Sequence, residues 1–542
     1  MDIEKSVNFS PLSPLSFLER NQWVYKNKEA IMYGLQKYSY VEFSDRIQRC
    51  ASALKNKGIQ PGDRVAYLCP NIPPMLEAHF AVPLLGAILV AMNTRLSPDE
   101  IAYICDHSGA KILVSDAELA IPLKSHKEKF SKIETFINVI DQQAGFSEKD
   151  AIFEGPEYEN LINSSENNEL PWKIEDELTP ISINYTSGTT GKPKGVMYTH
   201  RGAYLNALSG ILEARGSVYM NYLWTLPMFH CNGWCYPWGV TSVGGKHICL
   251  RTNEPEEIFR LIREEKVSHF CAAPTVLTGL SNHPAAKNGP FPQPVMVMTG
   301  GAPPSPTIIS TIEEELGGTI VHVYGLTETY GPHTVCTWNP DWDSLNNEDR
   351  AHLKSRQGVP FVITGECDVK DDEMKSVPWD KKTQGEVMMR GNTIMAGYYE
   401  NPKATEEAFK GGWFHSGDIA ITYEDGYIDL QDRAKDIIIS GGENISTIEI
   451  EKTIASHEAV LEVAVVAVPD DKWGEVPKAF IVKKDSVEVT TEEIIEHVKS
   501  KIARFKAPKY VEFGDLPKTS TGKIQKYKLR DKEWAGRKKR VN

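Results

Sequence analysis

The segment from Tyr185 to Gly195, with the sequence YTSGTTGKPKG, combines residue types that bind phosphate. Glycines let the backbone turn its N–H groups inward, and a polyanion needs such a cradle of donors. The loop is not a Walker A motif, because two residues instead of four separate its first glycine from the Gly-Lys pair. The pattern predicts a nucleotide phosphate site, and a polar surface loop is the alternative. The expected cradle consists of Thr186, Ser187, Gly188, Thr189, Thr190, Gly191, Lys192 and Lys194.

A second chemical cluster is YGLTET, residues 324–329. Thr327 offers a hydroxyl to a phosphate oxygen, and Glu328 offers the hard carboxylate that Mg²⁺ prefers. Tyr324 offers a flat ring to a base. The cluster therefore extends the prediction from phosphate to a whole nucleotide with its metal ion, although a strand end followed by a helix cap would have the same residues.

Two charged residues nearer the C-terminus also stand in glycine-containing turns. Asp418, in HSGD, has two carboxylate oxygens that can accept hydrogen bonds from both ribose hydroxyls. Lys523, in TSTGKI, places one positive charge on a glycine-hinged loop. The alternatives are a turn-forming aspartate and an ordinary surface lysine.

The elements that must position these residues alternate between helix and strand in the first third of the chain. Residues 43–57 and 74–85 have helical spacing, and residues 64–68 and 111–115 are short apolar runs typical of strands. A second run of this kind contains strands at 267–272 and 319–323 and a helix at 308–315. Such alternation predicts an α/β fold.

The sequence pattern changes after Gly358. Short strands with turn signals predict an antiparallel β subdomain, and the charged stretch 368–382 predicts a surface excursion. From Asp436 a further unit begins, with paired strands and a capped helix over 490–505. We therefore expect a large multi-subdomain N-terminal α/β domain and a small mobile α+β C-terminal domain.

Composition and charge narrow the class of protein. The 542 residues are 41% hydrophobic and 25% charged, which excludes collagen-like and disordered chains. A net charge of −13 argues against a general nucleic-acid binder. The nine cysteines are odd in number and several lie in apolar runs, as in a reducing compartment. Residues 81–92 are too short to cross a membrane, and neither a signal peptide nor a peroxisomal tripeptide is present, so we expect a cytoplasmic protein.

Taken in order, the motifs resemble those of the AMP-forming acyl-CoA synthetases, within the adenylating superfamily that includes luciferases and peptide-synthetase adenylation domains. The resemblance covers nearly the whole chain. Besides the phosphate loop it rests on MFHCNGW (228–234), TGGAPPS (299–305), YGLTET (324–329), WFHSGD (413–418), DRAKDIIISGGENIS (432–446) and PKTSTGKIQK (517–526).

The resemblance implies a reaction and a division of the chain. A carboxylate and ATP would give acyl-AMP and pyrophosphate, and coenzyme A would then give acyl-CoA and AMP, with Mg²⁺ as the metal. Residues 1–432 would hold the ATP and acyl pockets, and residues 433–542 would form a lid that rotates about a hinge near Lys435. A homodimer stays open.

The resemblance also assigns roles by position. Catalysis would depend on Lys523, Thr327, Glu328 and the gating His230, with Glu328 on the metal. The resemblance assigns nucleotide binding to the loop residues named above, including Lys194. It assigns the same role to Gly301, Ala302, Tyr324, Gly325, Asp418 and Arg433. The tunnel for the pantetheine arm of coenzyme A would be lined by Ser440, Gly441, Gly442 and Glu443.

The acyl pocket would be formed by His230, Trp234, Gly300, Gly301 and Ala302. If the Trp234 ring points inward, it shortens the tunnel and favours short- or medium-chain acids. The apolar lining disfavours dicarboxylic acids. If the aromatic residues are ordinary core, the argument on chain length does not hold.

Two other functions remain open. A stand-alone adenylation enzyme could load a carrier protein, although 19 residues after Lys523 leave no room for a carrier domain in the same chain. A non-catalytic nucleotide-binding protein would be expected to lack Lys523, Glu328 or Asp418, and all three are present.

Overall fold

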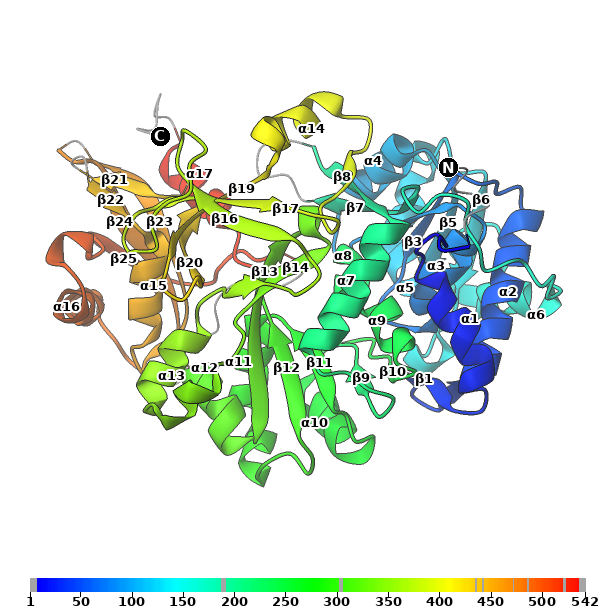
Figure 1. The fold of residues 1–542 in the computed structure, drawn as a ribbon, viewed down its shortest axis with the longest axis horizontal. Coiled ribbons are helices and arrows are strands. Elements are labelled where there is room, and N and C mark those ends of the chain that lie inside the picture. Colours follow the sequence, from blue (N-terminus) through cyan, green and yellow to red (C-terminus); the bar gives the residue numbers. More distant parts are fainter. Residues whose placement is uncertain are drawn as a thin grey trace.

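The computed structural model describes residues 7–186, 192–301, 306–433, 436–440, 443–470, 472–484, 487–519 and 523–535. The N-terminal third lies at one end of the molecule, and the segment after residue 436 lies at the other (Figure 1). The middle of the chain fills the space between them. The described residues form mixed α/β layers with a smaller unit at the C-terminal end, as the sequence predicts.

The first sheet holds the strand that leads into the phosphate loop. Its inner strands are parallel, and β8 and β18 join one edge in antiparallel fashion. Parallel strands are covered on both faces, which explains their continuous apolar runs. In spatial order the strands are β18 (Gly397–Tyr398), β8 (Lys194–Thr199), β7 (Pro180–Thr186), β4 (Ile88–Ala91), β3 (Arg64–Leu68), β5 (Ala110–Asp116) and β6 (Thr135–Val139).

The second sheet carries YGLTET at the end of β13. It is parallel in its centre and antiparallel at both edges. In spatial order the strands are β15 (Val359–Pro360), β14 (Gly331–Val335), β13 (Gly318–Leu326), β12 (Val295–Thr299), β11 (His269–Ala272), β9 (Asn221–Leu223), β10 (Lys246–Ile248), β1 (Glu29–Tyr33) and β2 (Gln36–Ser39).

Two further sheets follow. The third is antiparallel, as the turn signals predict, and the fourth is antiparallel except at one pair of strands. The third sheet orders β16 (Glu366–Lys370), β17 (Gly385–Arg390), β19 (Phe414–Thr422) and β20 (Ile428–Arg433). The fourth sheet, in the C-terminal unit, contains β22 (Glu443–Ile445), β21 (Ile438–Ser440), β24 (Gly474–Lys483) and β23 (Val460–Asp470), with β25 (Tyr510–Phe513) beside β24.

Helices cover these sheets (Figure 1). In the N-terminal half they are α1 (Leu15–Val24), α2 (Tyr40–Asn56), α3 (Pro73–Leu84), α4 (Pro98–Ser108), α5 (Ala117–Ala120), α6 (Tyr158–Ser164), α7 (His200–Glu213), α8 (Cys231–Trp234), α9 (Tyr236–Ser242) and α10 (Pro255–Glu264). The later ones are α11 (Pro274–Asn282), α12 (Pro306–Ser310), α13 (Asn347–Lys354), α14 (Pro402–Ala408), α15 (Thr447–Ala455), α16 (Thr491–Lys501) and α17 (Lys526–Glu533).

Local sequence sets where several helices begin. Ser39 and Glu42 form a capping box at the start of α2, and Thr490 and Glu493 form another at the start of α16, each satisfying backbone donors that the first turn leaves free. Helix α16 ends at Lys501, short of the predicted 505, because Ile502 is extended and a separate 3₁₀ turn follows over Arg504–Lys506. The sequence therefore predicted the first residue of α16 more accurately than its last residue, because a capping box marks only the start.

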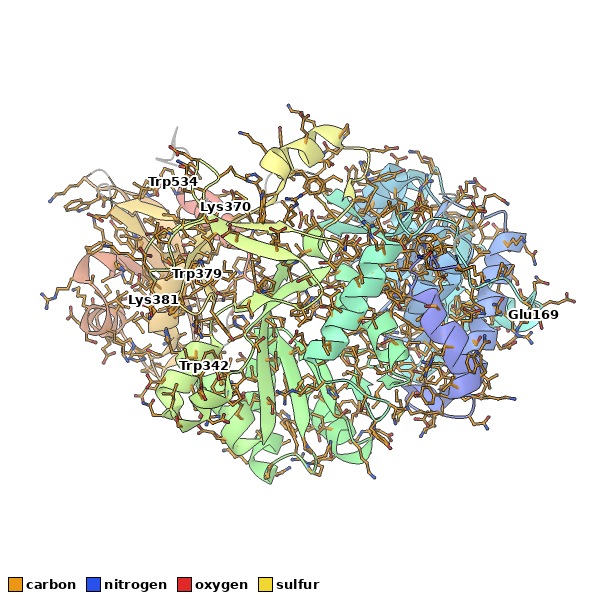
Figure 2. The ribbon with its side chains drawn as sticks, viewed as in Figure 1. Glu169, Trp342, Lys370, Trp379, Lys381 and Trp534 are labelled. Atoms are coloured by element: carbon orange, nitrogen blue, oxygen red, sulfur yellow. The ribbon has the colours of Figure 1, made fainter. Side chains whose placement is uncertain are left out.

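The charged stretch 368–382 lies mostly at the surface beyond β16, as predicted, and Figure 2 shows Trp379 and Lys381 among its side chains. Lys370 is an exception, since its ammonium is 4.7 Å from the centre of the Trp413 ring. In the described part of the chain, no helix is both long and apolar enough to cross a membrane.

A buried ionic cluster ties the first sheet to the second. Arg251, which follows β10, lies 2.8 Å from Asp116 at the end of β5 and 2.9 Å from Asp141 just after β6. The Tyr33 hydroxyl of β1 donates to Asp141 at 2.5 Å. The Asp116 side chain is fully buried, so its charge depends on this guanidinium. The cluster fixes the mutual position of the two sheets that carry the candidate site.

Replacing Arg251 by Met should lower the free energy of unfolding by about 3–5 kcal/mol, because two buried carboxylates would lose their cation. Urea unfolding followed by circular dichroism at neutral pH measures the change. Arg260→Met is the matched control, since Arg260 pairs with Glu257 and Glu264 at the surface of α10 and such pairs contribute about 0–1 kcal/mol. Equal small losses in both variants would show that the cluster does not hold the sheets together.

Candidate active site

Two residues predicted from separate motifs meet at the carboxylate of a third, Asp418. The Tyr324 hydroxyl donates to Asp418 Oδ2 at 2.7 Å, and Arg433 Nε lies 3.3 Å from Asp418 Oδ1. Asp418 and Arg433 are direct partners across the β19–β20 pair, which explains how residues 15 apart in sequence face each other. Burial strongly raises the pKa of Tyr324, so its hydroxyl is a donor. A carboxylate has further lone pairs, so Asp418 retains the capacity to accept from a ribose.

Lys523 comes to the same place from the C-terminal unit. Its loop is closed by a hydrogen bond from the Lys523 N–H to Thr519 Oγ1 at 3.0 Å. The positive charge of Arg433, and then burial, lower the pKa of Lys523 to about 8, while Asp418 acts in the opposite direction. Lys523 is nevertheless exposed to solvent. Such an environment favours the arrival of an anion.

The YGLTET motif is held in place by two tyrosines that the sequence analysis did not select. The Tyr198 hydroxyl donates to the Thr327 carbonyl at 2.7 Å, and the Tyr398 hydroxyl donates to Glu328 Oε1 at 2.7 Å. Tyr198 is on β8 and Tyr398 on the adjacent β18. Contacts between segments far apart in the sequence bring both phenols to the motif, so no local sequence signal could have found them.

The phosphate loop is described only at its flanks. Thr186 and Lys194 pair across the β7–β8 ladder, and the Lys194 ammonium lies 4.7 Å from the centre of the Tyr398 ring. Thus Lys194 and Glu328 contact the same tyrosine, one at its face and one at its hydroxyl. Other predicted residues lie outside the described residues, namely Ser187, Gly188, Thr189, Thr190, Gly191 and Ala302.

His230 directly precedes a segment with left-handed backbone conformation. Burial, and then the charge of Lys523, lower the pKa of His230 to about 4, so the imidazole is neutral at physiological pH. The next five residues, Cys231 to Cys235, all have positive φ, between 49° and 65°. Such a left-handed turn costs about 1–2 kcal/mol per non-glycine residue. The turn is offset partly by Asn232, whose Oδ1 accepts from Ser182 and Asn184 at 2.7 Å each.

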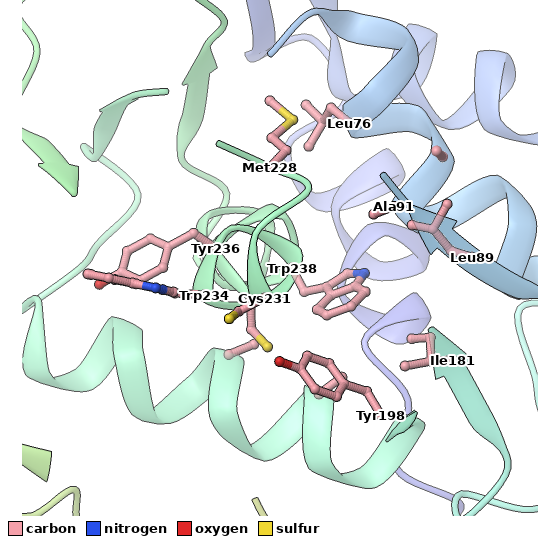
Figure 3. Close-up of a cluster of buried hydrophobic side chains, with 14 of the residues drawn as sticks. Leu76, Leu89, Ala91, Ile181, Tyr198, Met228, Cys231, Trp234, Tyr236 and Trp238 are labelled. Atoms are coloured by element: carbon pink, nitrogen blue, oxygen red, sulfur yellow. The ribbon is translucent and has the colours of Figure 1, made fainter. Parts of the chain in front are cut away.

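The left-handed turn directs the Trp234 indole into a slot between two strands. The ring is 7% exposed. A Cβ placed on Gly300 would lie 3.3 Å from the indole, and one on Gly331 would lie 2.6 Å from it, so the ring fills the space that these glycines leave free. Figure 3 shows Trp234 and Tyr236 on one side of Cys231 and Trp238 on the other.

Trp238 and Tyr236 are core residues. Trp238 is fully buried and donates from Nε1 to the His79 carbonyl at 2.9 Å, while the Tyr236 hydroxyl donates to the Gly210 carbonyl at 3.3 Å. The expectation about chain length therefore rests on Trp234. Gly301, which follows Gly300 in the sequence, is exposed and has φ +88°, a conformation that favours glycine.

The predicted coenzyme A segment is partly described. Ser440 and Glu443 are partners across the β21–β22 hairpin. Gly441, Gly442 and the predicted hinge Lys435 lie outside the described residues. Gly325, predicted for the nucleotide, follows Tyr324 on β13, and a Cβ there would lie 1.9 Å from the Gly331 carbonyl. Only glycine fits this position without moving the backbone.

The donors around Glu328 fit Mg²⁺ that arrives with a nucleotide. Among the described residues, no cluster of three or more His, Cys, Asp or Glu side chains could hold a metal alone. Mg²⁺ is typically bound by one or two carboxylates together with substrate phosphates. Glu328, next to Thr327 and near Lys194, is a carboxylate of this kind.

Comparison with known proteins gives matches over almost the entire chain. Residues 18–399 match the family model described as AMP-binding enzyme, and residues 449–523 match the AMP-binding enzyme C-terminal domain. A 4-hydroxybutyrate–CoA ligase of Metallosphaera sedula is 44% identical over 523 residues, which are 96% of this chain and 95% of that protein. An acetate–CoA ligase of Humulus lupulus is 45% identical over 551 residues, covering 98% and 96% of the two chains.

A solved structure has the same fold. The crystal structure of an anthranilate CoA ligase in complex with anthranoyl-AMP superposes with a TM-score of 0.83 at 25% identity, covering 98% of this chain and 99% of that one.

The perturbed Lys523 amine can be tested by chemical labelling. With a pKa of about 8, the amine is protonated below that pH and becomes a neutral nucleophile above it. We expect an amine-acylating reagent at pH 8 to label Lys523 faster than Lys509, whose pKa the neighbouring Asp470 raises. Peptide mapping by mass spectrometry gives both rates as a function of pH.

Arg433→Gln provides the control for this experiment, because it removes the largest cause of the shift. In this variant the midpoint of Lys523 labelling should move to higher pH, while Lys509 labelling stays constant. An unchanged midpoint would show that Arg433 does not act on Lys523.

Proposed function

The chain belongs to the AMP-binding enzyme family, and on this premise we propose how its own residues catalyse the reaction and which acid it accepts. It is an AMP-forming acid–thiol ligase that uses ATP, Mg²⁺ and coenzyme A, since its full-length relatives are CoA ligases. A carboxylate and ATP give acyl-AMP and pyrophosphate, and coenzyme A then gives acyl-CoA and AMP. The assignment of steps to residues is our proposal.

In the first half-reaction a carboxylate oxygen of the acid attacks the α-phosphorus and pyrophosphate leaves with the electron pair of the broken P–O bond. We assign Asp418 to the ribose and Thr327 and Lys194 to phosphate oxygens. Protonated Lys523 would lie between the carboxylate and the α-phosphate and stabilise the charge that builds up there. Mg²⁺, held by Glu328 when bound, would neutralise phosphate charge.

The second half-reaction needs a different arrangement. The thiol sulfur attacks the acyl carbon, the thioester bond forms, AMP leaves as an anion and the thiol proton is released. We propose that residues 433–542 act as a lid hinged near Lys435, which withdraws Lys523 and brings the segment from Ser440 to Glu443 to the site.

The position of Lys523 is the observation that carries this assignment. Lys523 belongs to the C-terminal unit, yet Arg433 and Asp418 dominate its electrostatic surroundings, and it in turn acts on His230. This is the arrangement expected for the first half-reaction. His230, neutral at physiological pH, would not compete with Lys523 for the carboxylate of the acid.

We propose that the substrate is a short aliphatic carboxylic acid. Trp234 fills the slot between Gly300 and Gly331 and would end the acyl pocket close to His230. Two similar proteins are named for acetate and 4-hydroxybutyrate, both short acids. We also propose a cytoplasmic location and a homodimer, which fractionation of the source cells and sedimentation analysis would test.

Removing the Lys523 amine should separate the two half-reactions. We expect Lys523→Ala to slow acid-dependent pyrophosphate release about a hundredfold or more, because preorganised charge at the reacting centre is lost. Transfer from supplied acyl-adenylate to coenzyme A should stay near the wild-type rate. Lys518→Ala is the matched control, since Lys518 lies on the same loop and pairs with Glu462. Unchanged pyrophosphate release in Lys523→Ala would refute the assignment.

Replacing Trp234 by Gly should lengthen the acyl pocket. Glycine also relieves the left-handed backbone at φ 56°, so this variant limits the loss of stability. We expect kcat/KM for hexanoate relative to acetate to rise about tenfold or more, because each buried CH₂ contributes about 0.8 kcal/mol. Trp23→Ala, at an exposed site, is the control. A preference that does not change, in a folded Trp234→Gly protein, would exclude Trp234 as the limit on chain length.

A further inference from the structure

Tyr398 occupies a fixed position beside the phosphate loop. Its strand β18 pairs with β8, where Tyr398 faces Val196, and β8 begins at Lys194. The Tyr398 N–H donates to Thr405 Oγ1 of α14 at 2.9 Å, which anchors its backbone from the other side. The side chain is 9% exposed and has little freedom to move. Whatever contacts Tyr398 is therefore held at a defined distance from Lys194, where β8 begins.

The hydroxyl of Tyr398 holds one oxygen of Glu328. The O–H donates to Glu328 Oε1 at 2.7 Å, and the backbone of Glu328 accepts from the Met395 N–H at 2.8 Å. Burial, followed by the charge of Glu328, raises the pKa of Tyr398, so the phenol keeps its proton and can only donate here. Among the described residues none donates to the second oxygen, Oε2. One oxygen is thus fixed and the other is available.

The ring of Tyr398 contacts a second charged side chain, that of Lys194. The Lys194 ammonium lies 4.7 Å from the ring centre, within the range of a cation–π interaction. One side chain therefore sets the distance between a cation at the phosphate loop and the carboxylate at the end of β13. Both groups approach the same polyphosphate in the proposed function.

We propose that Tyr398 is a positioning residue for the metal–nucleotide complex: it holds Glu328 so that Oε2 would be available to Mg²⁺, and it holds Lys194 where the ammonium could bind the phosphates. The proposal rests on the proposed function, because it assumes that Glu328 holds the metal. Partners that orient a metal-binding side chain typically change metal affinity or activity about 10–100-fold when removed.

The test replaces Tyr398 by Phe, which keeps the ring under Lys194 and removes only the hydroxyl. Tyr399→Phe is the matched control, since Tyr399 is the next residue and no hydrogen bond from its hydroxyl occurs among the described residues. Binding of Mn²⁺ to the enzyme with a non-hydrolysable ATP analogue is measured by electron paramagnetic resonance. We expect Tyr398→Phe to weaken Mn²⁺ binding about tenfold or more, with no change in Tyr399→Phe.

Two activity measurements complete the test. In Tyr398→Phe the Mg²⁺ concentration for half-maximal pyrophosphate release should rise by a similar factor, while transfer from supplied acyl-adenylate should be unaffected. In a Glu328→Gln background, Tyr398→Phe should add no further loss of Mn²⁺ affinity, because the two residues act through one contact.

The outcomes distinguish the possible failures. Wild-type Mn²⁺ affinity in folded Tyr398→Phe, or an equal loss in both half-reactions together with a lower Tm, would overturn the positioning role. If the wild-type protein released no pyrophosphate with any acid, the proposed function itself would fail. If Glu328→Gln bound Mn²⁺ as tightly as wild type, the metal assignment would be wrong and the proposal would fall with it.

Discussion

Side chains from parts of the molecule that are far apart in the sequence approach the Asp418 carboxylate. Tyr324 reaches it from the second sheet and Arg433 from the third, and the charge of Lys523 in the C-terminal unit interacts with it. Arg433 and Lys523 are two cations around this anion, although the whole chain carries a net charge of −13. In the proposed function, an anionic nucleotide would relieve the repulsion between Arg433 and Lys523.

The part of the candidate site around His230 and Trp234, where the acid is proposed to bind, depends on backbone geometry rather than on charge. The left-handed turn after His230 is unfavourable in isolation and is retained because buried groups hold it, among them Asn232 and the indole of Trp234. Gly300 and Gly331, on two neighbouring regions of the second sheet, provide the room for that ring. The proposed limit on the length of the acid and the packing of the sheet thus depend on the same side chain, Trp234.

Much of this organisation could be predicted from the sequence because it is local. The strand over 64–68, the cap of α16, and the residue types of YGLTET each depend on neighbours within a few positions. The contact of Tyr398 could not be predicted, since it depends on the pairing of β18 with β8, about 200 residues apart in sequence. The contact of Tyr198 with Thr327 could not be predicted either, since the two residues are 129 positions apart. The positive φ values at 231–235 could not be predicted either, because the sequence there contains only one glycine.

The short strand β18 has a consequence for how this protein behaves in solution. It covers the edge of β8, whose backbone groups would otherwise be available to another polypeptide, and open sheet edges are common starting points for aggregation. At two residues, with α14 following closely, β18 itself offers little edge to a partner. The segment that presents Tyr398 to the active site therefore also protects the sheet, and changes that loosen it would reduce solubility as well as turnover.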